Sequence, residues 1–199
     1  DRSQSRGLGD VYKRQSLYFI AIIPSEEVAN EITSLKQEMA DLYNSKKALR
    51  VIPHITLKAP FTVSSNRDEE VSEWFENIKT NVNPFEIKLN GFGVFDNPKN
   101  PVIFAKPEES VSMRRLQKDI LIAFKKQFLN IPLHFHEEEF HPHMTIAYRD
   151  LTYTEFEKAW KIFNKKHFSV KFYNNTFYLL KHNGVQWKIA KTHTLQGFS

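Results

Sequence analysis

A five-residue pattern that occurs twice constrains the fold of this chain more than any other feature. The segment "PHITL" occupies residues 53–57 and "PHMTI" occupies residues 142–146, so each copy reads Pro-His-apolar-Thr-apolar. Each copy falls in a predicted strand that follows a predicted helix, and the element order has a period near half the chain. The sequence therefore predicts an α+β protein built from two related halves.

The elements around the first copy begin with a buried strand over 17–23 and a helix from Glu26 to about Lys47. A strand over 54–59 stops at Pro60, and an amphipathic helix over 66–81 follows, with Trp74 on its inner face. The remaining predicted elements are strands over 85–95 and 101–107, a helix over 108–129, a strand over 143–148, a helix over 152–166 that carries Trp160, and three C-terminal antiparallel strands.

Strand alternation gives the spacing of the motif its meaning. Residues i and i+2 of a strand face the same way, so the apolar residues of each copy can enter the core together. His54 and Thr56 then point out of the core on the other face, as do His143 and Thr145. If the two halves pack about a pseudo-two-fold axis, we expect the two His-Thr pairs to converge in one cleft.

Two imidazoles and two hydroxyls suit chemistry at a phosphodiester. In-line displacement at phosphorus needs a base for the attacking oxygen and an acid for the leaving oxygen. Histidine titrates near neutral pH, so one ring can be neutral while its partner is protonated. Threonine hydroxyls can donate hydrogen bonds to the non-bridging oxygens, where negative charge accumulates. This inventory requires no metal and no cofactor.

The chain resembles the two-histidine phosphoesterase superfamily, particularly its bacterial 2′-5′ RNA ligase and cyclic phosphodiesterase branch. The resemblance rests on "LYFIAIIP", "PHITL", "GFGVF…PVIFAKP" and "FHPHMTIA", and it covers nearly the whole chain after residue 15. It implies two pseudo-symmetric lobes around a central cleft, each an antiparallel sheet with helices on its outer face. It also implies cleavage or formation of 2′-linked or 2′,3′-cyclic phosphodiesters, with His54 and His143 as the acid/base pair and Thr56 and Thr145 as the phosphate ligands.

Five further residues near the motifs are candidates for substrate binding. Lys58 shares the alternation phase of Thr56, and Arg149 shares that of His143, so either cation could neutralise phosphate charge. A solvated charge at the strand end is the alternative for each. Phe61 and Tyr148 flank the motifs and could stack a base, although core packing is the simpler explanation for both. His141 is in phase with His143, in a position for substrate contact or for support of the catalytic ring.

A metal site is the rival interpretation of the second motif. His134, His136, His141 and His143 lie close together in the sequence and flank three glutamates. Imidazole and carboxylate are fair ligands for zinc or manganese. Pro142 interrupts any single ligand face, however, and the first copy of the motif has no such cluster, so we expect no metal here.

Composition narrows the remaining alternatives. The chain has no cysteine and a net charge of +5, which permits an anionic ligand without demanding nucleic acid. Residues 1–15 include "DVYKRQ", which resembles a translated sequencing adaptor, so we expect a disordered, non-native segment before a single domain over 16–199. We expect a cytoplasmic protein that acts on RNA ends or small nucleotides, without membrane or obligatory protein partner. A nucleotide-binding module without turnover is the alternative.

Overall fold

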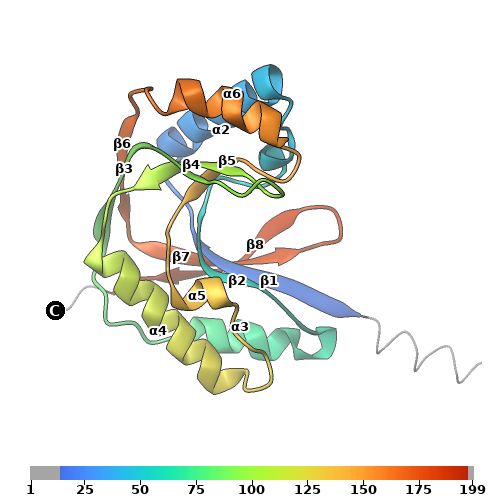
Figure 1. Cartoon of the computed structure of the whole chain (residues 1–199). Coiled ribbons are helices and arrows are strands. Elements are labelled where there is room, and N and C mark those ends of the chain that lie inside the picture. The colour runs from blue at the N-terminus through green and yellow to red at the C-terminus, as the bar shows by residue number, and fades with distance from the viewer. Residues whose placement is uncertain (1–13, 197–199) are drawn as a thin grey trace, which may run out of the picture.

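The structure is a computed structural model that describes residues 14–196, and its strands form two four-stranded antiparallel sheets (Figure 1). The first sheet has the order β2 (Ile55–Ser64), β1 (Gln15–Ile22), β7 (Thr176–His182) and β8 (Trp187–Thr194). The second has the order β5 (Met144–Ala147), β4 (Val102–Pro107), β3 (Phe85–Phe95) and β6 (Ser169–Asn174). The two sheets correspond strand by strand, which confirms the predicted pair of pseudo-symmetric lobes.

Helices cover the outer face of each sheet, so the molecule is layered helix, sheet, sheet, helix (Figure 1). The first sheet carries α3 (Asp68–Glu76) and α4 (Val111–Gln127), and the second carries α2 (Glu26–Tyr43) and α6 (Tyr153–Phe163). Short helical segments occur at η1 (Lys47–Arg50), η2 (Ser65–Arg67) and α5 (Phe135–Glu138). No helix within residues 14–196 is both long and apolar enough to cross a bilayer.

The lobes are not simply the two halves of the chain. Helix α2 follows β1 but packs against β5, while α4 follows β4 but packs against β2. Strand β7 pairs with β1, and β8 pairs with β7, so strands from the C-terminal part of the chain complete the first lobe. Each half therefore supplies the helix that covers the motif strand of the other half, and the two motifs are held in one framework.

Local signals explain where the first helix begins and ends. The Ser25 side chain accepts a hydrogen bond from the Val28 amide, and Glu26 and Glu27 occupy the first turn, where carboxylates favour the helix dipole. Asn44 takes a left-handed conformation with φ of 55°, which ends the helix at Tyr43. The predicted end near Lys47 is therefore too late.

Strand β2 shows how a proline is tolerated inside a sheet. The predicted end at Pro60 is wrong, because β2 continues to Ser64. It is an edge strand, and its register with β1 shifts between the Tyr18–Phe61 and Ile20–Lys58 pairs, so the missing amide of Pro60 falls where the ladder is already interrupted.

The start of β1 lies inside the segment 1–15, which the sequence predicts to be non-native. Gln15 pairs with Ser64, and the carbonyl of Arg14 accepts a hydrogen bond from the Ser65 amide. Within the described residues, β1 therefore begins inside the 1–15 segment, at Gln15. Residues 1–13 lie outside the described residues.

Candidate active site

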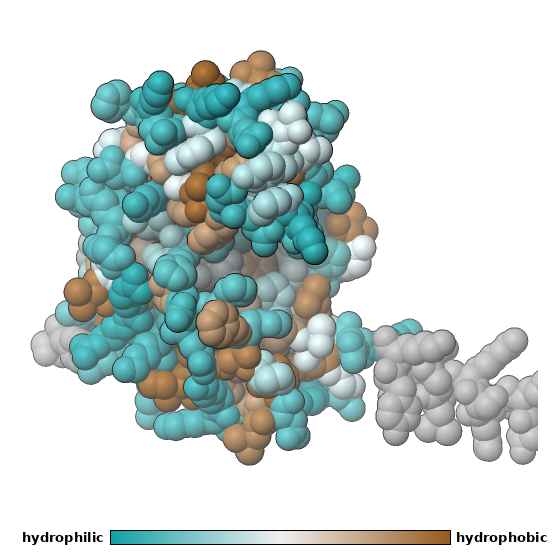
Figure 2. Space-filling view, in the orientation of Figure 1, coloured by the Kyte–Doolittle hydropathy of each residue, from teal (hydrophilic) through white to brown (hydrophobic). Residues whose placement is uncertain are grey.

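Both motifs face one cavity between the two sheets, where the surface recedes between the helix-covered lobes (Figure 2). His54 and Thr56 line it from the first lobe, and His143 and Thr145 line it from the second. Its volume is about 220 Å³. The structure thus brings together the four residues that the repeated pattern singled out.

The two histidines are held in the same way. The Nδ1 atom of His54 lies 2.7 Å from the carbonyl oxygen of Ile52, and that of His143 lies 2.8 Å from the carbonyl oxygen of His141. A carbonyl can only accept, so each ring carries a proton on Nδ1. Nε2 is then the nitrogen that remains to exchange a proton with a ligand.

Aromatic rings surround both imidazoles. The ring of Phe19 lies 5.0 Å from that of His54, while His143 contacts Phe95 at 4.9 Å and Phe104 at 5.5 Å between ring centroids. The Phe104 ring also occupies the space above Gly93, where a Cβ would lie 2.6 Å from the ring. Glycine at position 93 therefore leaves room for the Phe104 ring, which contacts His143.

This environment lowers the pKa of both histidines. Desolvation is the main cause for His54, whose pKa falls to about 4, and the charges of Lys36 and His143 add to the shift while the Ile52 carbonyl opposes it. Desolvation also lowers the pKa of His143, with a smaller contribution from the charge of His141. Both rings are therefore neutral at pH 7 before an anion binds.

A β-bulge follows each threonine and changes the direction of the next side chain. In the first lobe Thr56 pairs with Ala21 whereas Lys58 pairs with Ile20, so two residues of β2 oppose one step of β1. The second lobe repeats this arrangement, because Thr145 pairs with Phe104. In that lobe the bulge leaves Ala147 opposite Ile103.

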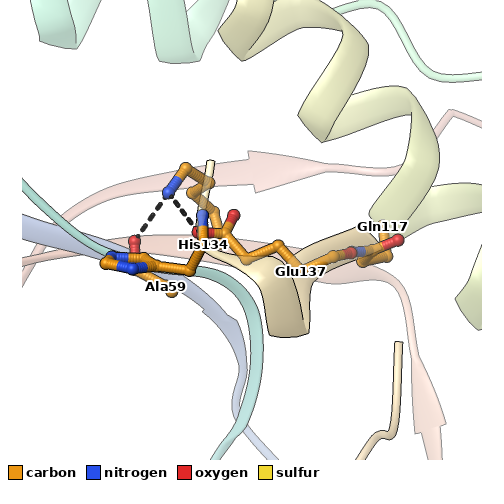
Figure 3. Close-up of polar contacts among 5 residues, drawn as sticks. Ala59, Gln117, His134 and Glu137 are labelled. Atoms are coloured by element: carbon orange, nitrogen blue, oxygen red, sulfur yellow. Dashed lines mark hydrogen bonds and ion pairs between the residues drawn. The ribbon is translucent and has the colours of Figure 1, made fainter. Parts of the chain in front are cut away.

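The bulge explains why Lys58 does not reach the cavity. The prediction that Lys58 contacts substrate assumed that Lys58 faces the same way as Thr56, and the bulge removes that regular alternation. The Lys58 side chain instead points toward the helices, where it is 1% exposed. Its Nζ atom donates to the Ala59 carbonyl and to Glu137 Oε1, both at 3.0 Å. Figure 3 shows Glu137 between Gln117 of α4 and His134. Lys58 is therefore part of a buried ion pair and lies outside the cavity lining.

The other four candidates divide between the cavity and its surroundings. Tyr148 and Arg149 line the cavity, and the Arg149 guanidinium lies 4.9 Å from the Tyr148 ring. Phe61 is buried in the core against Phe124, which is the simpler of the two explanations that the sequence offered for it. The side chain of His141 is exposed and does not line the cavity, but its carbonyl orients His143.

Sequence reasoning missed Lys36, which also lines the cavity. This residue of α2 is 3% exposed, and its Nζ atom donates to the Val51 carbonyl at 2.7 Å. Burial lowers the pKa of its ammonium group to about 8. The helical spacing could have indicated this burial, because Lys36 lies four residues from both Ile32 and Ala40 and therefore shares the apolar face of the helix. Aromatic Phe19 and Trp187 were missed as lining residues as well.

The histidines that precede the second motif do not gather into one potential metal-binding site. His134 precedes α5 and His136 lies within it, both with exposed side chains, while His143 faces the cavity. Nowhere in the described part of the chain do three or more His, Asp or Glu side chains gather in a way that could hold a metal ion. The repeated motif, and not the cluster, defines the candidate site.

Comparison with known proteins places this chain in a family. A profile of the 2′-5′ RNA ligase superfamily matches residues 24–186. A protein of Geobacillus thermodenitrificans (strain NG80-2) named "Putative phosphoesterase" is 28% identical over 185 residues, which are 90% of this chain and 96% of the relative. A relative of the same description from Bacillus cytotoxicus is 32% identical over 128 residues, or 64% of this chain and 67% of that protein.

Solved structures share the fold at low sequence identity. The protein TT0787 of Thermus thermophilus matches with a TM-score of 0.64 and 17% identity, over 92% of this chain and 100% of that one. Apo LigT of E. coli matches with a TM-score of 0.61 and 15% identity, over 93% of this chain and 100% of LigT. The chain belongs to the 2′-5′ RNA ligase superfamily, within the two-histidine phosphoesterases.

Proposed function

We propose that this protein is a phosphodiesterase that acts, without a metal, on 2′-linked or 2′,3′-cyclic phosphodiesters of RNA ends or small nucleotides. The observation that carries the proposal is the convergence of two equivalently held His-Thr pairs on one cavity. The same pair can promote 2′-5′ ligation, in which a 5′-hydroxyl loses its proton to one imidazole and attacks the phosphorus of a 2′,3′-cyclic phosphate. The bond from phosphorus to the 3′ oxygen breaks, and the other imidazole protonates that oxygen.

The residues supply each part of a hydrolytic step. One neutral imidazole takes a proton from water through Nε2 as the water oxygen forms a bond to phosphorus. The bond from phosphorus to the 2′ or 3′ oxygen breaks, and the other, protonated imidazole gives its proton to that leaving oxygen. Protons then return through solvent to restore the starting states. Each positioned acid or base is expected to contribute about 10²–10⁴-fold to the rate.

The threonines are suited to hold the phosphate. Thr56 and Thr145 are half-buried in the cavity, and neither hydroxyl has a hydrogen-bond partner within residues 14–196. Each can therefore donate to a non-bridging oxygen of the phosphate, where the negative charge grows in the transition state. Arg149 at the rim can neutralise part of that charge.

The size and lining of the cavity favour a terminal nucleotide. A volume of about 220 Å³ is below the range of about 300–1,000 Å³ for drug-sized ligands, so part of a nucleotide must extend into the open cleft. Phe19, Tyr148 and Trp187 give that part aromatic surfaces for base stacking. LigT of E. coli, which shares the fold, has been crystallised with 3′-AMP, which supports a nucleotide as the ligand.

The direct test is hydrolysis of 2′,3′-cyclic nucleotides in the presence of a chelator. We expect turnover by the wild type, and loss of about 10²–10⁴-fold in kcat/KM for His54→Ala and for His143→Ala. His136→Ala is the matched control, because His136 belongs to the same histidine-rich stretch but is exposed outside the cavity.

The outcomes separate the proposal from its alternatives. Full activity in both catalytic-site variants would refute the two-histidine mechanism. Activity abolished by the chelator would require a metal-dependent reaction instead. Tight nucleotide binding by a wild type that never turns substrate over would make the protein a binding module.

A further inference from the structure

The cavity is lined by a buried cation, Lys36, for which the described residues supply no neutralising partner. Within the described residues no carboxylate lies within ion-pair distance of Lys36, and the Val51 carbonyl is its one hydrogen-bond partner. A buried ammonium group is costly unless an opposite charge or several acceptors compensate it. A ligand anion in the cavity that Lys36 lines would supply that compensation.

The second half treats the equivalent position differently. Val51 precedes His54 by three residues, as Phe140 precedes His143, and the Phe140 carbonyl also accepts a hydrogen bond from a cation, Arg114 of α4, at 2.8 Å. Arg114 is paired with Glu109 by two hydrogen bonds of 2.9 Å, and it does not line the cavity. The two halves share the anchored carbonyl, but only the first leaves its cation unpaired inside the site, as far as the described residues show.

We propose that Lys36 is a further residue of the active site, which binds the phosphate of the substrate and makes His54 the general base and His143 the general acid. This inference rests on the proposed function. Lys36 is bound to the Val51 carbonyl and the His54 ring to the Ile52 carbonyl, each at 2.7 Å, so adjacent residues of the chain hold the cation and this ring on the same side of the cavity. A positive charge there favours the neutral form of His54, which is the form that can take a proton from water. The charge of Lys36 is among the causes that lower the pKa of His54, whereas the charge that acts on His143 is that of His141.

The division of roles gives a defined hydrolytic step. Nε2 of His54 takes the proton of the attacking water, and Nε2 of His143 gives its proton to the ribose oxygen that leaves phosphorus. Lys36, Thr56 and Thr145 hold the non-bridging oxygens. The other charged or titratable groups that line the cavity are Tyr148 and Arg149, which directly follow β5, and they are present in every variant used below.

The test uses the full chain with Lys36→Met, which removes the charge but keeps a long side chain, and Lys36→Arg, which keeps the charge. Lys166→Met is the matched control, because Lys166 pairs with Glu38 of the same helix on its solvent side. Affinity for inorganic phosphate is measured by calorimetry, and the pKa values of His54 and His143 by NMR. Neither measurement depends on turnover. Lys36→Gln, which keeps a donor for Val51, replaces Lys36→Met if that variant does not fold.

We expect Lys36→Met to weaken phosphate binding by about ten- to a hundredfold, the usual effect of losing a hydrogen bond to a charged group. The pKa of His54 should rise by more than that of His143, and the acidic limb of the kcat/KM profile should move to higher pH. Lys36→Arg should preserve phosphate binding better than Lys36→Met.

Unchanged phosphate affinity in Lys36→Met would overturn the binding role of Lys36. Equal pKa changes at both histidines would overturn the division of acid and base. If cyclic nucleotides are not hydrolysed by the wild type but Lys36→Met still loses phosphate binding, the proposed substrate is wrong and the phosphate site stands.

Discussion

The two motif strands share a backbone but differ in the charges around it. The two motif histidines are 89 positions apart, since 143 − 54 = 89. With the same offset, residue 58 of the first half corresponds to residue 147 of the second, and residue 48 corresponds to residue 137. The first motif is followed by Lys58, which forms a buried ion pair with Glu137 of α5. At the equivalent place in the second lobe both residues are alanine, Ala147 and Ala48, and both are buried.

This difference teaches which features the site needs twice. The proline, the carbonyl-bound histidine, the threonine and the bulge occur in both lobes. Within the described residues, the buried ion pair and the cavity cation without a carboxylate partner, Lys36, each lack a counterpart in the other half of the chain. The repeated features set the geometry for proton transfer and phosphate binding. The features that occur once can give the two histidines different surroundings, and so different acid and base roles.

Removing one member of the ion pair should have the largest effect. Glu137→Leu leaves the ammonium of Lys58 buried without its partner, so we expect a loss of about 3–5 kcal/mol in the free energy of unfolding. The double variant Lys58→Met with Glu137→Leu should recover most of that loss, because replacing both members of a buried ion pair with apolar residues is often neutral, and the equivalent place in the other lobe holds two buried alanines. Urea denaturation measures both.

The surface pair between Lys125 and Glu138 is the control for this comparison, because Glu138 is the next residue of the same short helix. Lys125→Met should change stability by less than about 1 kcal/mol, as is usual for exposed pairs. A double variant no more stable than Glu137→Leu would mean that this lobe depends on the ion pair itself.

Thr56→Val and Thr145→Val test whether the repeated hydroxyls contribute equally. Each removes a donor to the phosphate at almost constant volume, and we expect kcat/KM to fall by about ten- to a hundredfold in each case. Thr62→Val is the control, because Thr62 lies on the same strand as Thr56 but is exposed outside the cavity. A loss confined to one of the two threonines would show that a single lobe holds the phosphate.

The pH profile should show the smallest effect, as a displacement of the optimum. The pKa values of both histidines are lowered in the free protein, to about 4 for His54. Because kcat/KM reports the free enzyme, its bell-shaped profile should be centred below about pH 6.5, the usual pKa of histidine. The kcat profile should lie at higher pH, since bound phosphate favours protonated imidazole. A kcat/KM optimum above neutral pH would contradict the desolvated environment.

The repeated motif allowed the fold class and the four central residues to be predicted from sequence. Periodicity places His54 and Thr56 on one face, and the second copy implies a partner face. The same reasoning failed for Lys58, because a bulge is a local break in alternation that a rule of period two cannot detect in the letters "TLKAP". Lys36 was missed because lysine on a helix is normally solvated, and its burial depends on Val51 being brought near by the fold.

The exchange of segments between lobes has a consequence for how the chain is made. All strands of the second sheet have been synthesised once Asn174 is added, whereas the first sheet requires β7 and β8, which end at Thr194. The lobe that carries the first motif is therefore the last to be completed as the chain leaves the ribosome. Until then β1 has no neighbour on its β7 side, and its apolar "LYFIAII" edge must be kept from pairing with other chains.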